Sequence, residues 1–290
     1  MLDRHALTAL TQAVTRGDGA AFRSLYDDRA AAVYGVALRI TGDADGAAEA
    51  VQHTFVEAWR NLKGDGTRWD APDLELLRIC RNHASQIVNR HGQGPDAAAQ
   101  TAVAEPVRDG TASFELLSLL QMLGRMSDEC RDALTSVWYD CLTAEGLAAH
   151  LALTQEQTLA CIRRCYAEIR DASPPSDPVK DREADLLAMR QALGLSQRTE
   201  TADAAAVEDW ERNFAPFGEL VQPVPPPADA FDAIMARVNA LNSVETVAET
   251  GRKAEIWRAA LFVGIAAAAA LLIYFGLVAI GDDAGTLPNQ

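Results

Sequence analysis

Apolar residues recur at three- and four-residue spacing along most of the chain, and runs of β-branched residues are nearly absent. This spacing is typical of amphipathic helices, so the sequence predicts an all-α fold. A stretch of small residues with Gly and Pro at both ends interrupts the pattern, and a Pro-rich stop at 173–178 interrupts it again. We therefore expect a helical domain at 1–91, a flexible linker at 92–113 and a second helical domain at 114–172.

A third block, at residues 173–255, contains two more helical patterns followed by the stretch VQPVPPPADAF. Because its prolines are so closely spaced, this stretch is predicted to be an extended, semi-rigid spacer. After the spacer, Phe231, Ile234, Val238 and Leu241 fall on one side of a further predicted amphipathic helix.

An apolar run at 256–280 follows, and from Ala259 to Ile280 it holds no charged or amide side chain. About 20 apolar residues in a helix are enough to cross a bilayer, so this run predicts one transmembrane helix; a buried core helix is the alternative. The flanking charges are Arg252, Lys253 and Arg258 before the run and Asp282 and Asp283 after it. This asymmetry predicts a single-pass protein of the cytoplasmic (inner) membrane, with its N-terminus in the cytoplasm and a short exterior tail at 281–290.

The sequence carries no motif that is typical of an enzyme. No Gly-rich phosphate loop, nucleophile elbow or HExxH motif occurs in the sequence, so we expect neither catalytic residues nor a cofactor. His150, Cys161 and Cys165 have a spacing that matches no common zinc pattern, and we expect no metal site. The cysteines follow no disulfide framework, so reduced thiols are expected in a cytoplasmic chain.

Two stretches of the first block carry a family resemblance. The stretch ITGDADGAAEAVQHTFVEAWRNL resembles the second helix of region 2 in the extracytoplasmic-function (ECF) class of bacterial sigma factors, with Glu49, Val51, Gln52, Phe55 and Trp59 on the family's pattern. Downstream, LELLRICRNHASQIVNRHG resembles the helix with which the family melts promoters and reads the −10 element. The first domain is therefore expected to be a sigma region 2-like bundle.

The second block resembles region 4 of the same family. Residues 126–170 contain a short helix, a Leu142-Thr143 entry to a second helix, a turn at Leu151–Thr154 and a third helix from Gln155. This order is that of a helix-turn-helix, which places its last helix in a major groove. The resemblance to ECF sigma factors covers about the first 170 residues.

The later blocks resemble the membrane-anchored anti-sigma factors that partner ECF sigma factors. The resemblance lies in a W-E-x-x-F-A-P-F run, the proline-rich spacer, an I-x-x-R-V helix, a Trp and a single span. The residues that carry it are Trp210, Glu211, Phe214, Ala215, Pro216, Phe217, Ile234, Arg237, Val238 and Trp257. The chain thus looks like a sigma factor joined to an anti-sigma-like helical segment at 173–255.

The resemblance implies a membrane-tethered ECF-type sigma factor that directs RNA polymerase to promoters and is held inactive by its own C-terminal segment. Its implied partners are RNA polymerase core, promoter DNA and the membrane, and a separate anti-sigma factor or a regulatory protease is a further candidate. The implied polymerase-binding residues are Glu49, Gln52, Phe55 and Trp59. The implied DNA-binding residues are Arg78, Arg81, Asn82, Arg90, Gln155, Arg163 and Arg164.

A second reading is a sigma-like regulator that binds proteins and not DNA, either sequestering an anti-sigma factor or acting as a membrane signalling scaffold. It rests on charge, because DNA binding depends on cations that neutralise phosphates. In residues 1–172 Asp and Glu outnumber Lys and Arg, and Leu159 and Cys161 stand where the family usually has Lys or Arg. An unrelated helical membrane protein is the third reading. The promoter sequence, inducing signal, cleavage site and oligomeric state stay open.

Overall fold

The computed structural model describes residues 2–64, 69–91, 113–172, 181–196 and 199–241. These ranges contain helices and no strand, which confirms the predicted all-α class. No helix in them is both long enough and apolar enough to cross a bilayer. The predicted transmembrane helix at 256–280, the exterior tail and nearly all of the predicted linker lie outside the described residues.

The chain divides into two units, one that ends at Ile234 and one that begins at Met235. The second unit is described only at residues 235–241, which are helical. All contacts discussed below lie within the first unit.

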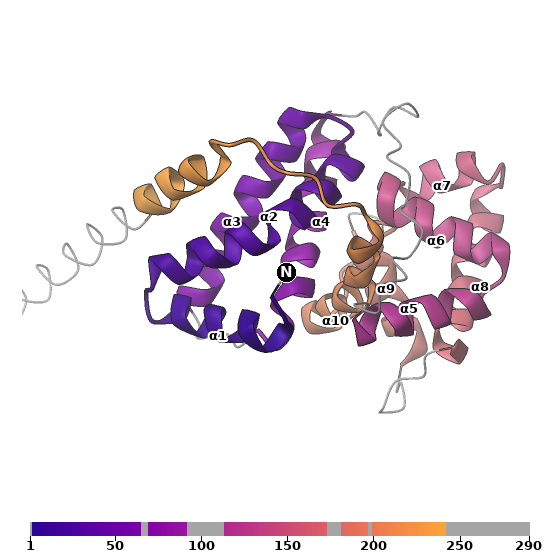
Figure 1. Ribbon diagram of the computed structural model, residues 1–290. Helices are drawn as coiled ribbons and strands as arrows, with labels where there is room; N and C mark the ends of the chain where they lie inside the picture. Colours follow the sequence, from indigo (N-terminus) through magenta and orange to yellow (C-terminus); the bar gives the residue numbers. More distant parts are fainter. Residues whose placement is uncertain (1, 65–68, 92–112, 173–180, 197–198, 242–290) are drawn as a thin grey trace, which may run out of the picture. The chain divides into compact units, whose positions relative to one another are not determined.

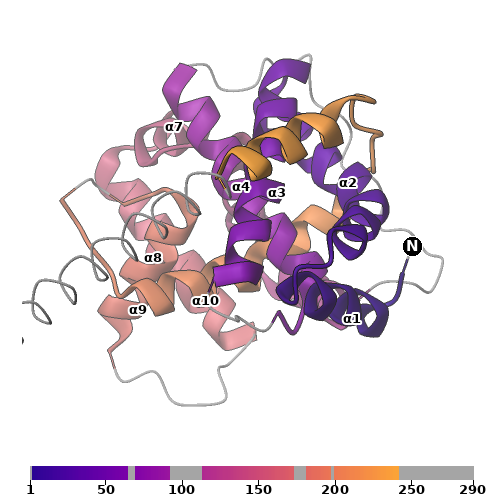
Figure 2. The same ribbon diagram turned by 90° about the vertical axis from the view of Figure 1, so that its left-hand side faces the viewer.

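The first four helices form a bundle that we call the N-terminal bundle, with α1 packed against the other three (Figure 2). Their bounds are α1 Arg4–Thr15, α2 Gly19–Thr41, α3 Ala44–Gly64 and α4 Pro72–His91. Helix starts follow local chemistry, since the Asp3 and Asp18 carboxylates accept hydrogen bonds from the first free backbone N–H groups of α1 and α2. Helix α2 ends at Gly42, whose φ of 78° is left-handed.

An aromatic cluster forms the core of the N-terminal bundle. The Phe22 ring of α2 meets the rings of Phe55 and Trp59 of α3 edge-on, with centroids 6.2 and 5.0 Å apart. Phe22 and Phe55 are fully buried, and Trp59 is nearly so. Edge-to-face pairs of this kind add to the free energy gained from apolar burial, so the cluster fixes how α2 packs on α3.

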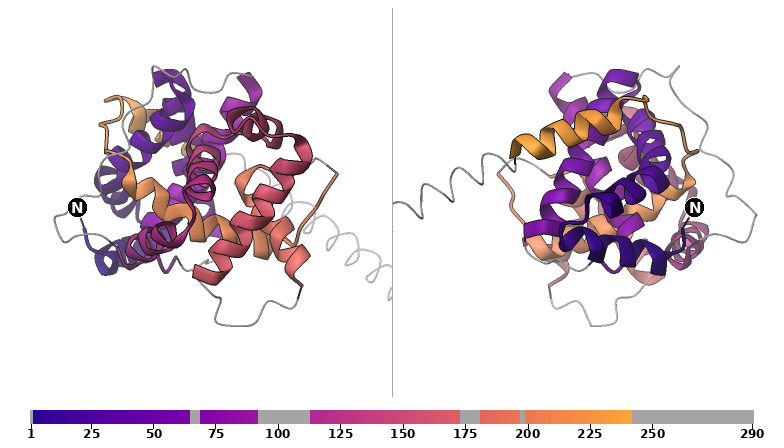
Figure 3. Two further views of the ribbon diagram at one scale, coloured as in Figure 1. Left: turned by 90° about the vertical axis from the view of Figure 1, so that its right-hand side faces the viewer. Right: turned by 60° about the vertical axis from the view of Figure 1, so that its left-hand side comes forward.

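The next four helices form the α5–α8 module, coloured magenta to pink in Figure 3. Their bounds are α5 Phe114–Arg125, α6 Asp128–Asp140, α7 Ala144–His150 and α8 Gln155–Ala172. The Thr143 hydroxyl caps the start of α7, and Ala152 turns the chain with a φ of 52° before α8 begins at Gln155. The helix-turn-helix order predicted for this stretch is therefore present, with α7 and α8 joined by a short turn.

Residues 181–234 form what we call the bridging segment, which contains α9 Arg182–Leu193, α10 Ala204–Phe214 and the 3₁₀ helix η2 Ala215–Leu220. Helix α9 packs on α8, α10 packs on α4, and η2 contacts α2, α4 and α5. Figure 1 shows α9 and α10 between the N-terminal bundle and the α5–α8 module. The bridging segment therefore contacts both the N-terminal bundle and the α5–α8 module.

Two ion pairs also join the N-terminal bundle to the α5–α8 module directly. The Arg39 guanidinium of α2 donates to the Asp140 carboxylate of α6 at 2.9 Å. Arg4 of α1 makes a two-pronged pair with Glu115 of α5, at 2.6 and 2.9 Å. The hydrogen bond to Arg4 lowers the pKa of Glu115 below its ordinary value.

After η2 the chain runs without helix along α2, a stretch that we call the strap (residues 221–229). The Val224 N–H donates to the Ala31 carbonyl of α2 at 2.9 Å. A Cβ at Gly35 would lie only 2.4 Å from the Gln222 carbonyl oxygen, so the absence of a side chain there is what lets the strap approach α2. Two residues beyond the strap, the Phe231 ring packs 4.9 Å from that of Tyr26 and under the guanidinium of Arg23.

Gly35→Ala should change stability in opposite directions in two lengths of chain. In residues 1–172, Ala should raise the free energy of unfolding by about 0.5–1 kcal/mol, because Gly is a poor residue inside a helix. In residues 1–241, the clash with the strap should lower it by about 1–3 kcal/mol. Denaturant unfolding of both lengths measures the two signs.

Gly124→Ala in α5 is the matched control, since nothing lies within 4 Å of its Cβ position. It should stabilise both lengths. If Gly35→Ala also stabilises residues 1–241, the strap does not lie on α2 in solution.

Candidate nucleic-acid interface

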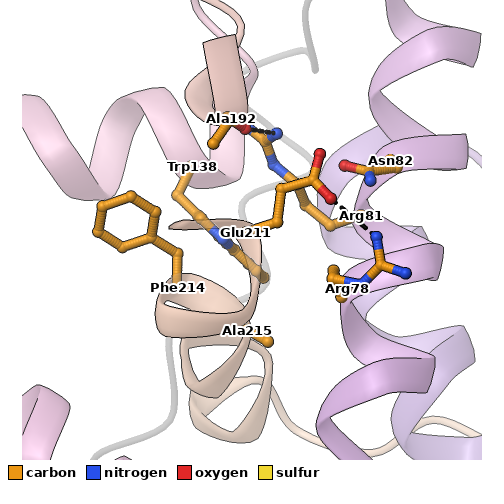
Figure 4. A pocket seen from close by; sticks show the side chains of 8 residues that line it. All are labelled: Arg78, Arg81, Asn82, Trp138, Ala192, Glu211, Phe214 and Ala215. Carbon is orange, nitrogen blue, oxygen red and sulfur yellow. Dashed lines mark hydrogen bonds and ion pairs between the residues drawn. The ribbon is translucent and has the colours of Figure 1, made fainter. Parts of the chain in front are cut away.

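Arg81, a predicted DNA-binding residue, is buried under the end of α9. Its side chain donates to the Ala192 and Leu193 carbonyl oxygens at 2.8 and 3.1 Å, and the residue is 7% exposed. These carbonyls close α9, and the C-terminus of a helix carries about half a negative charge. Figure 4 shows the guanidinium of Arg81 reaching this helix end. Arg81 is thus bound by backbone carbonyls and not by a carboxylate.

Arg78, one turn earlier on α4, is held by two carboxylates. It donates to Glu211 of α10 at 2.8 Å and to Glu75 of its own helix at 3.0 and 2.5 Å. Burial lowers the pKa of Arg78, but the hydrogen bonds to Glu75 and Glu211 outweigh that effect and raise it above its ordinary value. Asn82 lies beside both arginines and lines a small cavity with Glu211 and Trp138 (Figure 4). The bridging segment therefore covers this face of α4.

The carboxylate of Asp185 on α9 joins three helices. It accepts hydrogen bonds from Arg170 at 2.8 and 2.6 Å, from the Tyr166 hydroxyl at 2.7 Å and from the Trp210 indole N–H at 2.8 Å. The guanidinium of Arg170 also lies 4.1 Å from the centre of the Trp210 ring, a cation–π contact. Burial and the bond to Asp185 raise the pKa of Tyr166. This cluster, the Asp185 hub, fastens α9 and α10 to α8.

The outer face of α8 carries the other predicted DNA-binding residues of the helix-turn-helix. Gln155 is exposed at the first turn of α8. Arg163 is 3.6 Å from Glu183 of α9, and both side chains are mostly exposed. Arg164 is 2.6 Å from Glu129 of α6, a pair internal to the module. Both arginines of this face are thus paired with carboxylates, although solvent still reaches them.

A buried aromatic contact fastens η2 to α6. The Tyr139 hydroxyl donates to the Phe217 carbonyl at 2.7 Å, and the Trp138 ring lies 5.5 Å from that of Phe217. Burial raises the pKa of Tyr139 well above its ordinary value. On the opposite side of η2, a Cβ at Gly218 would lie 3.1 Å from Leu77 of α4. The 3₁₀ helix therefore fits closely between the bundle and the module.

The predicted polymerase-binding residues fall into two environments. Phe55 and Trp59 point into the core of the N-terminal bundle. Glu49 lies on the surface of α3 and pairs with Arg90 of α4 at 2.8 Å, which brings together one predicted polymerase contact and one predicted DNA contact. The Gln52 amide donates to the Ala233 carbonyl of the bridging segment at 3.2 Å. The roles of all four residues stay predictions.

Sequence reasoning named Glu211 and Phe217 only as part of a motif, and it missed Asp185, Tyr139 and Gly35. Asp185 lies in the stretch DREADLL, where it reads as one acid among several on a helix face. One signal for Gly35 was available in the sequence. It lies in the middle of an Ala-rich predicted helix, and a glycine at such a place often has a packing reason, such as the close approach of another backbone.

Two properties of the described residues bear on metal binding and thiol chemistry: the grouping of possible ligands and the pKa values of the cysteines. No group of three His, Cys, Asp or Glu side chains in those ranges could hold a metal ion. Burial raises the pKa of Cys80 to about 12, and it also raises that of Cys141. These thiols stay protonated near neutral pH, which makes them poor ligands and poor nucleophiles.

No family model matches the chain. It is 27% identical over 173 residues to the ECF RNA polymerase sigma factor SigK of Mycolicibacterium vanbaalenii, which covers 55% of this chain and 88% of the relative. SigK of Mycobacterium tuberculosis is 27% identical over 173 residues, covering 55% of this chain and 92% of the relative.

About half of this chain is similar to ECF sigma factors. The similarity supports the predicted ECF sigma factor, and it also confirms the prediction that the chain is not an enzyme. From here the N-terminal bundle and the α5–α8 module together are called the sigma-like region.

Asp185→Ala should lower the free energy of unfolding of residues 1–241 by about 3 kcal/mol, because Arg170 would lose its carboxylate partner and the Tyr166 and Trp210 donors would lose an acceptor. Asp209→Ala on α10 is the control, since Asp209 is exposed and pairs with Arg212 of the same helix. It should cost less than about 0.5 kcal/mol. Equal effects of the two substitutions would show that the Asp185 hub contributes nothing specific. Denaturant unfolding measures both.

Proposed function

We propose that the chain is an ECF-type sigma factor that directs RNA polymerase to promoters and is held inactive by its own bridging segment. The observation that carries the proposal is the state of α4: Arg78 and Arg81, both predicted DNA-binding residues, are bound by Glu211 and by the end of α9. A helix whose arginines are engaged and covered in this way is not available to DNA.

The predicted polymerase contact on α3 is engaged as well. Gln52 donates to the Ala233 carbonyl, two residues beyond Phe231, whose ring packs on Tyr26. The bridging segment therefore lies on residues proposed for both partners, polymerase and promoter. Because it belongs to the same chain, its effective concentration at these surfaces can reach the millimolar range, and moderate contacts suffice to keep it bound.

The proposal includes a tether to the cytoplasmic membrane through residues 256–280, with the sigma-like region in the cytoplasm. It is supported by the uncharged apolar run and by the basic residues before it. In cell fractionation, residues 1–290 should stay in the membrane pellet after a high-salt wash, whereas residues 1–241 should be released. Release of both chains would contradict the tether.

A sigma-like regulator that binds proteins and not DNA is the second candidate. It is favoured by the outer face of α8, where Arg164 is neutralised by Glu129 and Leu159 is partly exposed. Such a protein would use the same surfaces to bind a separate anti-sigma factor.

Run-off transcription with RNA polymerase core and the DNA upstream of the gene separates the candidates. Residues 1–172 should support transcription, and residues 1–241 should support much less, because the bridging segment covers α4. Arg81→Ala should lower transcription by residues 1–172.

Transcription that is equal for the two lengths would refute inhibition by the bridging segment. Absence of transcription from both, with no binding to polymerase core, would favour the protein-binding regulator.

A further inference from the structure

We propose that the bridging segment is a mimic of DNA: its carboxylates and the C-terminus of α9 occupy the positions at which α4 and α8 would bind phosphates. Duplex DNA and the bridging segment then compete for the same arginines. This inference rests on the proposed function, and it adds a physical mechanism to it, since covering a surface does not by itself require matching charges.

Acidic residues of the bridging segment pair with two sets of arginines, those of the sigma-like region and those of the segment itself. Two of its acids bind arginines of the sigma-like region, since Glu211 binds Arg78 and Asp185 binds Arg170. Glu219 instead accepts a hydrogen bond from Ser113. Other acids bind arginines of the segment itself: Glu200 pairs with Arg190, and Glu208 and Asp209 pair with Arg212. The bridging segment thus supplies carboxylates to two arginines of the sigma-like region.

Glu183 extends this arrangement to the outer face of α8. Its carboxylate lies 3.6 Å from Arg163, a residue proposed to contact DNA. On the other side of the segment, Arg81 donates to the free carbonyls at the end of α9, where the helix carries partial negative charge. Negative groups of the bridging segment therefore lie against both helices that are proposed to bind DNA.

Arginine suits this exchange because its planar guanidinium can donate two parallel hydrogen bonds either to a carboxylate or to a phosphate. Each arginine that passes from a carboxylate of the segment to a phosphate of DNA also contributes to counterion release from the duplex. Competition between the two partners should consequently depend on salt, and it should weaken when the carboxylates of the segment lose their charge.

The test compares two double variants of the full-length chain that change the net charge equally. Glu183→Gln with Glu211→Gln removes charge that faces the sigma-like region, and Glu208→Gln with Asp209→Asn removes charge that faces Arg212. The probe is a short fluorescent duplex of random sequence, and its affinity is measured by anisotropy across a range of salt concentrations.

We expect the first double variant to bind the duplex several-fold more tightly than the wild type, with a steeper salt slope, because Arg163 loses its carboxylate partner and Arg78 keeps only Glu75. The second double variant should bind like the wild type. Adding Arg78→Ala to the first double variant should remove much of the gain, because Arg78 is one of the arginines from which the variant takes a carboxylate of the segment.

Equal gains from both double variants would overturn the mimic, because net charge alone would then explain them. No gain from either would also overturn it. A second measurement needs no variant: excess duplex added to the wild-type chain should accelerate hydrogen exchange in α9 and α10, and unchanged exchange would contradict competition.

These outcomes are distinct from failure of the proposed function. If residues 1–172 direct transcription and the first double variant binds DNA like the wild type, the mimic fails and the proposed function stands. If the first double variant gains affinity and no length of chain directs transcription, competition for the arginines stands and the proposed sigma function fails.

Discussion

A guanidinium group that is removed from water must find acceptors, and two such groups lie on one face of α4. Arg78 and Arg81 are both largely buried, and without partners each would destabilise the fold by several kcal/mol. Their acceptors come in large part from the bridging segment, as the Glu211 carboxylate and the carbonyls of Ala192 and Leu193. The arginines of α4 can therefore be buried only when α9 and α10 are in place to supply their acceptors.

Contacts of a different kind hold the rest of the bridging segment. Tyr139 and Trp138 pack against Phe217, and the Phe231 ring, just beyond the strap, packs against that of Tyr26. Apolar contacts of this kind change little with salt, whereas the exposed pair between Arg163 and Glu183 weakens as salt rises.

Much of this fold follows from local patterns in the sequence. The helical spacing predicted the all-α class, and the turn at Leu151–Thr154 placed the start of α8 correctly at Gln155. The W-E-x-x-F-A-P-F run marked the stretch where Glu211 and Phe217 act. What could not be predicted is pairing over long separations in the chain. Nothing local tells that Asp185 meets Arg170 and Trp210, or that Gly35 faces the Gln222 carbonyl, because both depend on where the strap and α9 pack.

The central claim is that the bridging segment keeps the sigma-like region from its partners, and binding of RNA polymerase core tests it most directly. The measurement compares the wild-type full-length chain with a variant that carries both Gly35→Ala and Asp185→Ala, which loosens the strap and the Asp185 hub while changing no residue proposed to contact polymerase or DNA. The account predicts that the double variant binds core much more tightly than the wild type. Equal affinity of the two folded chains for core would contradict it.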